Sequence, residues 1–333
     1  MKITVILCTY NRCQSLVQTL EDVAASRLDD SVEWEVLVVD NNSTDRTRSV
    51  VEDLCCRCPG RFRYLFEPQQ GKSYALNAGV REARGDVLAF VDDDVTVEPT
   101  WLQNLTGALD GGKWAGVGGR TLLAGTFSPP EWMTMEGSDN HGDILAALFD
   151  LGPGPCELNR PPYGTNMAFR REMFEKHGLF RTDLGPQPGS EIRSEDTEFG
   201  RRLMAAGEKL GYEPSAIVYH PVHENRVQKS FFLRWHFDFG RAMVREWGSG
   251  PNILGISRRC FTFFKFLGTL LPRAILRWVI TLHPQRRFFR KCQVWTAVGQ
   301  IVEIRRQWQN AGGRSSCSTR GQAKAAVPKL TGL

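Results

Sequence analysis

The chain has 333 residues, of which 41% are hydrophobic and 24% are charged. This balance suits one large or two modest globular domains and excludes a collagen, a wholly disordered chain and a disulfide mini-protein. Residues 1–223 carry 22 Lys and Arg against 33 Asp and Glu, a net charge of −11, whereas residues 224–333 carry 20 against 4, a net charge of +16. We therefore expect an acidic body that binds a cation together with a phosphorylated ligand, and a basic C-terminal part that meets an anionic surface.

The cysteines and the apolar runs bear on the compartment. Nine cysteines follow no disulfide-scaffold spacing, which favours a reducing, cytoplasmic setting. The first apolar run, Ile3–Leu7, is too short for the core of a signal peptide and is predicted to be a buried strand. No C-terminal window reaches the roughly 18 uninterrupted apolar residues that a membrane-spanning helix needs. The sequence predicts a cytoplasmic protein that meets the cytoplasmic face of a membrane only peripherally.

Strands and helices alternate through the first ninety or so residues. Strands are predicted at Ile3–Cys8, Glu35–Asp40, Arg61–Phe66 and Val87–Val91. Helices are predicted at Cys13–Ala25, after a cap at Ser43 or Thr44, and at Ser73–Arg84. Continuous apolar strands that alternate with helices are typical of a parallel sheet covered on both faces. Such sheets bind ligands at the carboxyl ends of their strands, so polar residues at those ends are candidate site residues.

The rest of the body is less regular. The proline-containing loops of residues 125–164 are expected to shape a substrate pocket. Beyond them we predict two strands, at Asn166–Arg170 and Ile217–His220, and two helices, at Arg171–His177 and Glu195–Ala206. The polar residues 312–333 are predicted to form a disordered tail, because they contain too few apolar side chains to pack.

Three consecutive aspartates, Asp92, Asp93 and Asp94, directly follow the strand Val87–Val91. Carboxylates this close repel one another, and at the end of a buried strand they need a cation. Mg²⁺ or Mn²⁺ suits carboxylate oxygens and can bridge them to a diphosphate. The alternative is an acidic turn in which Asp94 caps the next helix.

Polar residues also follow the first two strands. Thr9, Asn11 and Arg12 provide short polar groups and a cation that suit a phosphate or a base, or else form an ordinary strand-to-helix turn. Asp40, at the end of the second strand, can accept hydrogen bonds from a nucleobase or ribose. Lys72 can approach a diphosphate as a point charge. It does not belong to a Walker A loop, because Phe66 stands where that motif needs its first glycine.

Two acidic residues begin the predicted helix Glu195–Ala206. Glu195 or Asp196 can act as a general base on an acceptor hydroxyl that attacks a sugar carbon. The alternative is that the two acids complement the helix dipole behind a Ser194 cap. His220, after a short strand, either completes a metal shell or packs in the core.

Taken in order, these segments resemble the family 2 glycosyltransferases of the GT-A fold, which are inverting enzymes that use nucleotide-diphosphate sugars. The resemblance covers roughly residues 3–250 and rests on the order and spacing of seven segments. These are Ile3–Arg12, Val36–Asp45, Gly71–Gly79, Asp92–Leu102, Gly118-Gly119-Arg120, Gly164–Arg171 and Glu195–Gly207. The resemblance implies an α/β fold with a Rossmann-like central sheet, forming a catalytic domain over residues 1–250.

The resemblance also implies roles for the candidate residues on the donor side. The nucleotide would be held by Thr9, Asn11, Arg12 and Asp40. The run Asp92-Asp93-Asp94 would be the D-x-D motif that binds the metal and the diphosphate. Within it, Asp94 would be the metal ligand, and Asp92 or Asp93 would face the ribose or the donor sugar.

On the acceptor side, the resemblance implies that Asp196 is the base that deprotonates the acceptor. The segment Gly164-Thr165-Asn166 would line the donor or acceptor pocket. His220 matches a position that binds metal in some members, although His223 offers a second histidine at the same turn.

The activity predicted on this basis is a metal-dependent, inverting transfer of a sugar, with Mn²⁺ or Mg²⁺ as cofactor. The donor would be a nucleotide-diphosphate sugar and the acceptor a hydroxyl of a glycan or a lipid-linked molecule, in polysaccharide, glycolipid or related glycan synthesis. One alternative is a sugar nucleotidyltransferase, which would carry a Gly-rich phosphate loop where Thr9-Tyr10-Asn11-Arg12 stands. Another is a nonenzymatic nucleotide-sugar or nucleic-acid binder, which needs no acceptor base such as Asp196.

Residues 251–311 are predicted to form a basic amphipathic helical extension. On a helix through Arg258–Arg277, basic and polar residues fall opposite Phe263, Leu267 and Leu270, and Pro272 would kink or split it. This pattern suits a helix that lies in the interface of an anionic membrane. The alternative is a pair of helices packed on the catalytic domain. Nucleic acid is not the expected partner, because the aromatic residues here stand among aliphatic ones rather than in an RNA-binding module.

Overall fold

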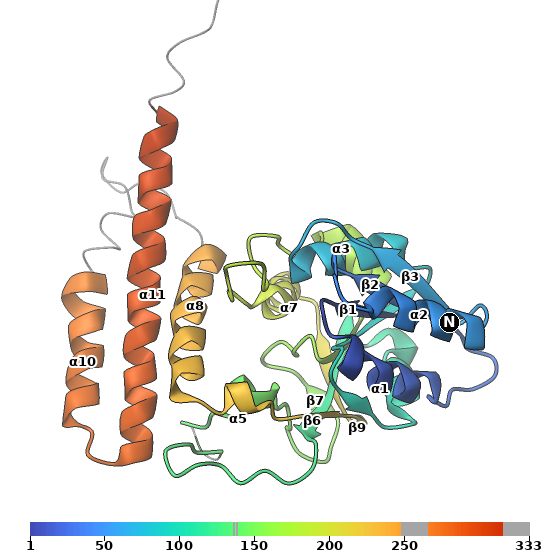
Figure 1. The fold of residues 1–333 in the computed structure, drawn as a ribbon, viewed down its shortest axis with the longest axis horizontal. Helices are drawn as coiled ribbons and strands as arrows, with labels where there is room; N and C mark the ends of the chain where they lie inside the picture. Colours follow the sequence, from blue (N-terminus) through green and yellow to red (C-terminus); the bar gives the residue numbers. More distant parts are fainter. Residues whose placement is uncertain (136, 138, 248–265, 316–333) are drawn as a thin grey trace, which may run out of the picture.

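The computed structural model describes residues 1–135, 137, 139–247 and 266–315. A nine-stranded sheet with helices on both faces forms the body, and the C-terminal part adds a layer of helices at one side (Figure 1). The predicted α/β fold is confirmed.

The first half of the sheet follows the predicted alternation. Its strands are β1 (Lys2–Thr9), β2 (Glu33–Asp40), β3 (Phe62–Phe66) and β4 (Val87–Val91). They pair in parallel in the order β3-β2-β1-β4. The helices α1 (Cys13–Ala24), α2 (Thr47–Arg57) and α3 (Lys72–Glu82) connect them.

The second half makes the sheet mixed. β8 (Asn166–Arg170) pairs antiparallel with β4 and with β6 (Gly116–Leu123), and β6 pairs in parallel with β9 (Leu210–His220). The short strands β5 (Thr96–Val97) and β7 (Cys156–Glu157) both pair antiparallel with β9. The prediction of a short strand at Ile217–His220 was wrong in length. β9 has 11 residues, because it continues along β6 across a register shift at Gly119/Arg120.

Four further helices complete the body: α4 (Trp101–Gly107), α5 (Gly142–Ala146), α6 (Arg171–His177) and α7 (Glu195–Ala205). Successive side chains of a strand point to opposite faces, and this alternation divides the core. Val5 of β1 packs in a cluster with Leu16 of α1, whereas Ile6 packs in a second cluster with Leu76 of α3 and Phe199 of α7. Both faces of the sheet are therefore buried, as predicted.

The predicted start of the second helix was wrong. α2 begins at Thr47, and neither Ser43 nor Thr44 caps it. The Asp45 carboxylate accepts the backbone N–H of Thr47, and its other oxygen accepts the N–H of Cys13 at the start of α1. Asp45 takes the place of Ser43 or Thr44 as hydrogen-bond acceptor, because its two carboxylate oxygens can accept N–H groups from the first turns of two neighbouring helices.

The C-terminal layer consists of α8 (Lys229–Trp247), the π-helical segment Phe266–Leu270, α10 (Leu271–Ile280) and α11 (Pro284–Ser315). α11 packs along α8, and α10 packs on α11 as the outermost helix (Figure 1). Pro272 lies in the first turn of α10, where a missing N–H costs little. Most of the predicted basic face, including Arg258, lies outside the described residues. α11 continues to Ser315, past the predicted start of the tail at residue 312, and residues 316–333 also lie outside the described part.

α8 and α11 cross in backbone contact. A Cβ placed on Gly240 would overlap the carbonyl oxygen of Thr296, and one on Gly299 would overlap that of Phe237. Only glycine permits this approach at either position. Beside the crossing, the buried carboxylate of Glu303 receives Arg241 at 3.2 Å and Arg245 at 2.9 Å.

The layer docks on the body through a third apolar cluster. Phe288 and Cys292 of α11 and Phe232 of α8 pack there with Met133 and Leu145 of the body. Of the predicted extension, α11 packs on α8 and on the body, as the alternative of helices packed on the catalytic domain expects, whereas α10 packs on α11. No helix in the described ranges has both the length and the hydropathy to cross a bilayer.

Candidate active site

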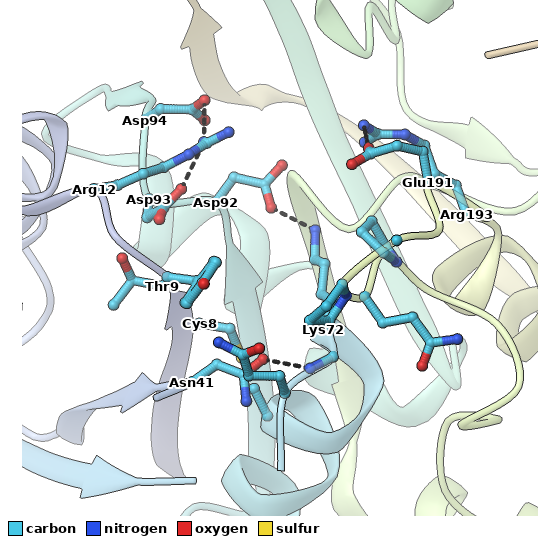
Figure 2. A pocket seen from close by; sticks show the side chains of 18 of the residues that line it. Cys8, Thr9, Arg12, Asn41, Lys72, Asp92, Asp93, Asp94, Glu191 and Arg193 are labelled. Carbon is cyan, nitrogen blue, oxygen red and sulfur yellow. Dashed lines mark hydrogen bonds and ion pairs between the residues drawn. The ribbon is translucent and has the colours of Figure 1, made fainter. Parts of the chain in front are cut away.

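A cavity of about 380 Å³ opens at the carboxyl ends of β1 and β4 (Figure 2). Its walls come from these strand ends, from the start of α3, from the loop of residues 186–193 ahead of α7 and from Arg226 after β9. The predicted site residues that line it are Thr9, Arg12, Lys72, Asp92, Asp93 and Asp94. The cavity thus lies where ligands bind to sheets of this kind.

Two buried aspartates share one arginine. Arg12 Nη1 lies 3.0 Å from Asp93 Oδ1 and 2.6 Å from Asp94 Oδ2. Burial raises the pKa of Asp93 to about 6 despite this arginine. Burial acts on Asp94 as well, but the hydrogen bond with His223 and the neighbouring His220 and Arg12 outweigh it and hold the pKa of Asp94 well below its usual range. Asp94 is therefore ionised and available to a cation.

The alternative role of Asp94 as a helix cap does not apply, because the next helix, α4, begins only at Trp101. Asp94 instead belongs to a trio with Asp92 and His220, whose ligand atoms all lie within 4.8 Å of one another. Sequence reasoning had placed Asp92 on the donor side, whereas the structure brings it into the same group. Two carboxylates and an imidazole are donors that suit Mn²⁺.

His220 is oriented as a metal ligand would be. Its Nδ1 lies 2.7 Å from the carbonyl oxygen of Pro221, so Nδ1 donates its hydrogen there and Nε2 carries the lone pair. Nε2 faces Asp94 Oδ1 at 3.8 Å. His223 differs, because it is half-exposed and its Nε2 is already engaged with Asp94 Oδ2 at 2.9 Å. These residues fit a divalent cation, with His220 rather than His223 as the nitrogen donor.

Lys72 does not stand free for a diphosphate. Its Nζ donates to Asp92 Oδ1 at 2.8 Å and lies 3.9 Å from Glu195 Oε1. Burial opposes the ammonium charge, but Asp92 and Glu195 raise the pKa of Lys72 above its usual range. Lys72 therefore links the aspartate run to the acidic pair at α7, and because it also lines the cavity its role as a point charge for a diphosphate stays a prediction.

The acidic pair divides into an accessible and an inaccessible member. Asp196 is half-buried, with Oδ2 accepting the N–H of Gly164 and Oδ1 that of Thr197, both at 2.6 Å. Glu195 is 3% exposed, and burial together with Asp196 raises its pKa to about 7. Ser194, the predicted cap of this helix, makes no side-chain capping bond. Asp196 is the better placed of the two to meet a ligand.

The segment before β8 holds Asp196 and Asp92 in place through hydrogen bonds. Gly164 donates to Asp196, and the hydroxyl of Thr165 donates to Asp92 Oδ2 at 2.7 Å. The prediction that Asn166 lines the pocket was wrong. Asn166 is 2% exposed, accepts the indole N–H of Trp101 at 2.8 Å and donates to two backbone carbonyls of β6 and β9. Its hydrogen-bonding capacity is used to join strands.

Two predicted nucleotide-binding residues lie below or beside the cavity rather than on its wall. Asp40 is 2% exposed and accepts the N–H of Ser43 and the hydroxyl of Tyr64 at 2.8 Å. Asn11 is exposed and accepts the N–H of Thr44, which ties the loop after β1 to the loop after β2. Both hold loops together, and Asn41, next to Asp40, lines the cavity in their place.

Three charged residues that line the cavity were not predicted from the sequence. Glu191, Arg193 and Arg226 line the cavity, and Glu191 and Arg193 lie across it from Arg12 and Asp94 (Figure 2). Burial and the nearby Arg193 lower the pKa of the Arg226 guanidinium. No local pattern marks these residues, because an arginine in a loop resembles any surface arginine until its neighbours are known.

Comparison with known proteins identifies the family and agrees with this fold. The family described as glycosyl transferase family 2 matches residues 4–178. Succinoglycan biosynthesis protein ExoM of Rhizobium meliloti is 30% identical over 246 residues, which are 74% of this chain and 75% of that protein. Glucosyl-dolichyl phosphate glucuronosyltransferase of Haloferax volcanii is 28% identical over 242 residues, 68% of this chain and 72% of that protein.

Solved structures share the fold at low identity. The mannosyltransferase PcManGT from Pyrobaculum calidifontis, in complex with GDP-Man and Mn²⁺, has a TM-score of 0.60 at 18% identity and covers 90% of this chain and 86% of its own. GalNAc-T7 with UDP, GalNAc and Mn²⁺ has a TM-score of 0.52 at 16% identity and covers 72% of this chain and 47% of its own.

The mixed sheet that this chain shares with these structures is that of the GT-A class of glycosyltransferases. The chain belongs to glycosyltransferase family 2. The family resemblance and the enzyme class expected from the sequence are both confirmed, and the alternatives of a sugar nucleotidyltransferase and a nonenzymatic binder are set aside.

Proposed function

We propose that this glycosyltransferase is metal-dependent and inverting, and that it transfers a sugar from a nucleotide-diphosphate sugar to a hydroxyl of a glycan or lipid-linked acceptor. One observation carries the proposal. Gly164 and Thr165, adjacent in the chain, hold Asp196 and Asp92 respectively. A candidate base and a candidate metal ligand are thereby kept in one site, as a single-step transfer requires.

Asp92, Asp94 and His220 would hold Mn²⁺ or Mg²⁺, which supplies positive charge to a departing diphosphate when bound. The Mn²⁺ in the structures of PcManGT and GalNAc-T7 supports this choice. Thr9, Arg12 and Asn41, which line the cavity, would contact the nucleotide and its phosphates. Asp40 and Asn11 would support them by keeping the two loops in place.

Asp196 acts as the general base. It takes the proton of the acceptor hydroxyl while the acceptor oxygen forms a bond to the anomeric carbon of the donor. The bond from that carbon to the diphosphate oxygen breaks, its electron pair leaves with the diphosphate, and the configuration at the carbon inverts. The N–H groups of Gly164 and Thr197 keep the carboxylate oriented for this transfer. Glu195 is too buried to reach an acceptor and positions Lys72 against Asp92.

The experiment that tests this function measures thermal stability with UDP, GDP, CDP and dTDP, each with and without Mn²⁺. A ligand at 100 times its dissociation constant adds about 2.7 kcal/mol to the free energy of unfolding. We expect one nucleoside diphosphate to stabilise the wild type only with the metal, and Asp94→Asn to lose this effect. Asp30→Asn, at an exposed site, is the matched control. A wild type that none of the four diphosphates stabilises with Mn²⁺ would contradict the proposal.

We also propose that α10 binds the cytoplasmic face of an anionic membrane peripherally. Its outward side exposes Leu276, Val279 and Ile280, with 57–63% of each side chain accessible. Exposed arginines flank this surface at Arg273 and Arg277, and a loop carries a further exposed apolar residue at Leu282. Apolar side chains beside arginines, on the outermost helix and at the basic end of the chain, match the charge and polarity of such a membrane surface.

Flotation with anionic vesicles tests this surface in the full chain. We expect the wild type to float at low salt and to be released at high salt, because salt screens the arginines. Ile280→Asp should float less, whereas Val17→Asp, an equal change at an exposed site on α1, should behave as the wild type. Equal recovery of the wild type and Ile280→Asp would mean that α10 is not the docking surface. A truncation before α11 is unsuitable, because Phe288 and Cys292 pack on the body.

A further inference from the structure

Two arginines on the cavity wall have no role in the function proposed so far. Arg193 lies in the loop of residues 186–193, just before the acidic pair of α7, and Arg226 ends the 3-10 turn Glu224–Arg226 that follows β9. Figure 2 shows Arg193 and Glu191 on the side of the cavity opposite Arg12 and Asp94. Arg193 therefore faces a ligand from the side that the aspartates do not cover, and Arg226 lines the same cavity.

Arg226 is a half-buried cation without a carboxylate partner. Its Nη1 donates to the carbonyl oxygen of Leu145 at 3.2 Å, and no carboxylate of the described residues lies within ion-pair distance of it. Its charged neighbours are the cations Arg193 and Arg12 and the carboxylates Asp94 and Asp92. Because neither carboxylate forms an ion pair with it, the partly buried guanidinium keeps hydrogen-bonding capacity that a bound anion can use.

Arg193 also has unused binding capacity. Its Nη2 donates to Glu191 at 2.9 Å, but the Glu191 side chain is 64% exposed, so solvent screens this pair. Its Nε–H is buried and meets no acceptor among the described residues. An unmade hydrogen bond at a buried donor carries a desolvation cost that a bound acceptor would remove.

Both arginines are held by packed structure rather than by free loops. Ile192 in the cavity-lining loop and Leu184 just before it pack on Ala242 of α8. Arg226 is anchored to the backbone of α5 through Leu145. Groups fixed in this way bind with little loss of conformational entropy.

The charges of the site leave a diphosphate without full compensation. Asp92, Asp93 and Asp94 together carry three negative charges at neutral pH when all are ionised, whereas Arg12, Lys72 and one divalent cation carry four positive charges. The single positive charge that remains does not balance the two negative charges of a diphosphate ester, which therefore needs a further cation. The guanidinium fork is suited to phosphate oxygens, which it can bind through two parallel hydrogen bonds.

We propose that Arg193 and Arg226 form a diphosphate-binding pair, which binds a diphosphate at the cavity wall together with the candidate metal group. This inference rests on the proposed function, because it assigns the pair to the diphosphate of that reaction. The diphosphate belongs either to the sugar donor or to a lipid-linked acceptor, and the chemistry recognised is the same in both cases.

Titration calorimetry on the full chain tests the pair. The probes are the nucleoside diphosphate that stabilises the wild type, the matching monophosphate and inorganic pyrophosphate, each in Mn²⁺ and in EDTA. Arg193→Gln and Arg226→Gln should each weaken binding of the two diphosphates about 10-fold or more, since each removes charge-assisted hydrogen bonds, and should weaken the monophosphate less. Arg226→Lys, which keeps the charge but not the fork, should fall between the wild type and Arg226→Gln.

Arg234→Gln is the matched control, because Arg234 is an exposed arginine on α8 away from the cavity lining. Thermal melting of each variant establishes that it is folded. Diphosphate affinities of both Gln variants equal to that of the control would overturn the inference and leave the proposed function intact. A wild type that binds no nucleoside diphosphate with Mn²⁺ would instead count against the proposed function, while the pyrophosphate titrations still compare the variants.

A competition arm separates the two sources of diphosphate. If saturating nucleoside diphosphate displaces pyrophosphate, the pair serves the donor. If pyrophosphate binds beside saturating nucleoside diphosphate and is lost in the Gln variants, the pair serves a diphosphate-linked acceptor. Either result supports a diphosphate-binding pair.

Discussion

The catalytic body and the C-terminal helical layer use their charges in different ways. In the body, buried carboxylates and cations meet at one cavity, where Asp93 and Asp94 share Arg12 and Asp92 pairs with Lys72. In the layer, the arginines of α10 and of the start of α11 point to solvent, and Glu303 forms the buried ion-pair cluster that joins α8 and α11. Charge is concentrated inward where a ligand is to be bound, and outward where the protein meets its surroundings.

The two regions are nevertheless joined at the site. Ile192 in the cavity-lining loop and Leu184 just before it pack on Ala242 of α8, and Arg181 donates to the backbone of Arg245 at the end of the same helix. The layer therefore supports the wall that carries Arg193. It also packs on Leu145, whose carbonyl oxygen accepts a hydrogen bond from Arg226. Changes in the layer can reach the cavity through these two contacts.

The largest effect is expected inside the body. Asp196→Asn removes the proposed base and should lower kcat by about 10²–10⁴-fold, a typical contribution of general base catalysis, while nucleotide affinity changes little. Steady-state transfer kinetics and nucleotide titrations measure the two quantities. Asp30→Asn is the control at an exposed position. A variant that keeps wild-type kcat would remove Asp196 from the mechanism.

The next effect belongs to the layer. Glu303→Ala leaves the partly buried Arg245 without a carboxylate and Arg241 with Asp238 alone, and should lower the free energy of unfolding by about 3–5 kcal/mol. Glu52→Ala breaks an exposed pair with Arg48 on α2 and should cost no more than about 0.5 kcal/mol. Denaturant unfolding of both variants measures the difference. Equal losses would mean that burial does not distinguish the ion pairs of the two regions.

A smaller loss is expected at the crossing of α8 and α11. Gly299→Ala places a Cβ against the carbonyl oxygen of Phe237 and should lower the free energy of unfolding by roughly 1–3 kcal/mol. Gly268→Ala, in the same layer, meets open space and serves as the control. Denaturant unfolding measures stability, and nucleotide titration follows the cavity. If Gly299→Ala is as stable as Gly268→Ala, the two helices do not depend on close backbone contact.

The smallest effects concern pH, and their signs oppose one another. Burial and Asp196 raise the pKa of Glu195 from 4.5 to about 7, so its contribution to stability is full below pH 4.5 and is lost as the pH rises to about 7. Burial lowers the pKa of His236 on α8 from 6.5 to about 3, so stability is lost as the pH falls from 6.5 towards 3. The body therefore loses stability as the pH rises from 4.5 to about 7, and the layer loses stability as the pH falls below 6.5.

Thermal melting from pH 4 to pH 8 checks both signs. Glu195→Gln cannot ionise and should gain stability relative to the wild type as the pH rises from 4.5 to 7. His236→Asn should gain relative to the wild type as the pH falls below 6.5. Melting curves of both variants that stay parallel to the wild type across the whole range would refute these assignments.

The fold was predictable in the first half of the sheet, where strands that are close in the chain also pair with one another. Apolar runs such as Val87–Val91 end as strands at the expected residues, and α6 coincides with the predicted Arg171–His177. The antiparallel placement of β8 between β4 and β6 was not predictable, because it depends on pairings between segments far apart in the chain. A local sequence pattern predicts which face of the sheet a side chain lies on, but it does not predict which strand its own strand pairs with.

The candidate site residues likewise divide into those that a local sequence pattern identified and those whose role depends on distant contacts. Asp92, Asp93 and Asp94 were identifiable, since adjacent carboxylates at a strand end are costly without a cation. Asn166 and Lys72 carried a polar signal too, but tertiary contacts use Asn166 to join strands and Lys72 to link Asp92 with Glu195. A polar residue at a strand end can satisfy the protein or bind a ligand, and only its neighbours distinguish the two.

The sequence by itself determined the α/β class, the carboxylate run at the end of β4 and the division into an acidic body and a basic C-terminal part, because each follows from residues that are close in the chain. The tertiary structure alone decided that His220 turns its Nε2 towards Asp94, that Asp196 rather than Glu195 is accessible, and that two unpredicted arginines complete the cavity wall. These features arise from hydrogen bonds and burial between distant segments, which have no local signature in the chain.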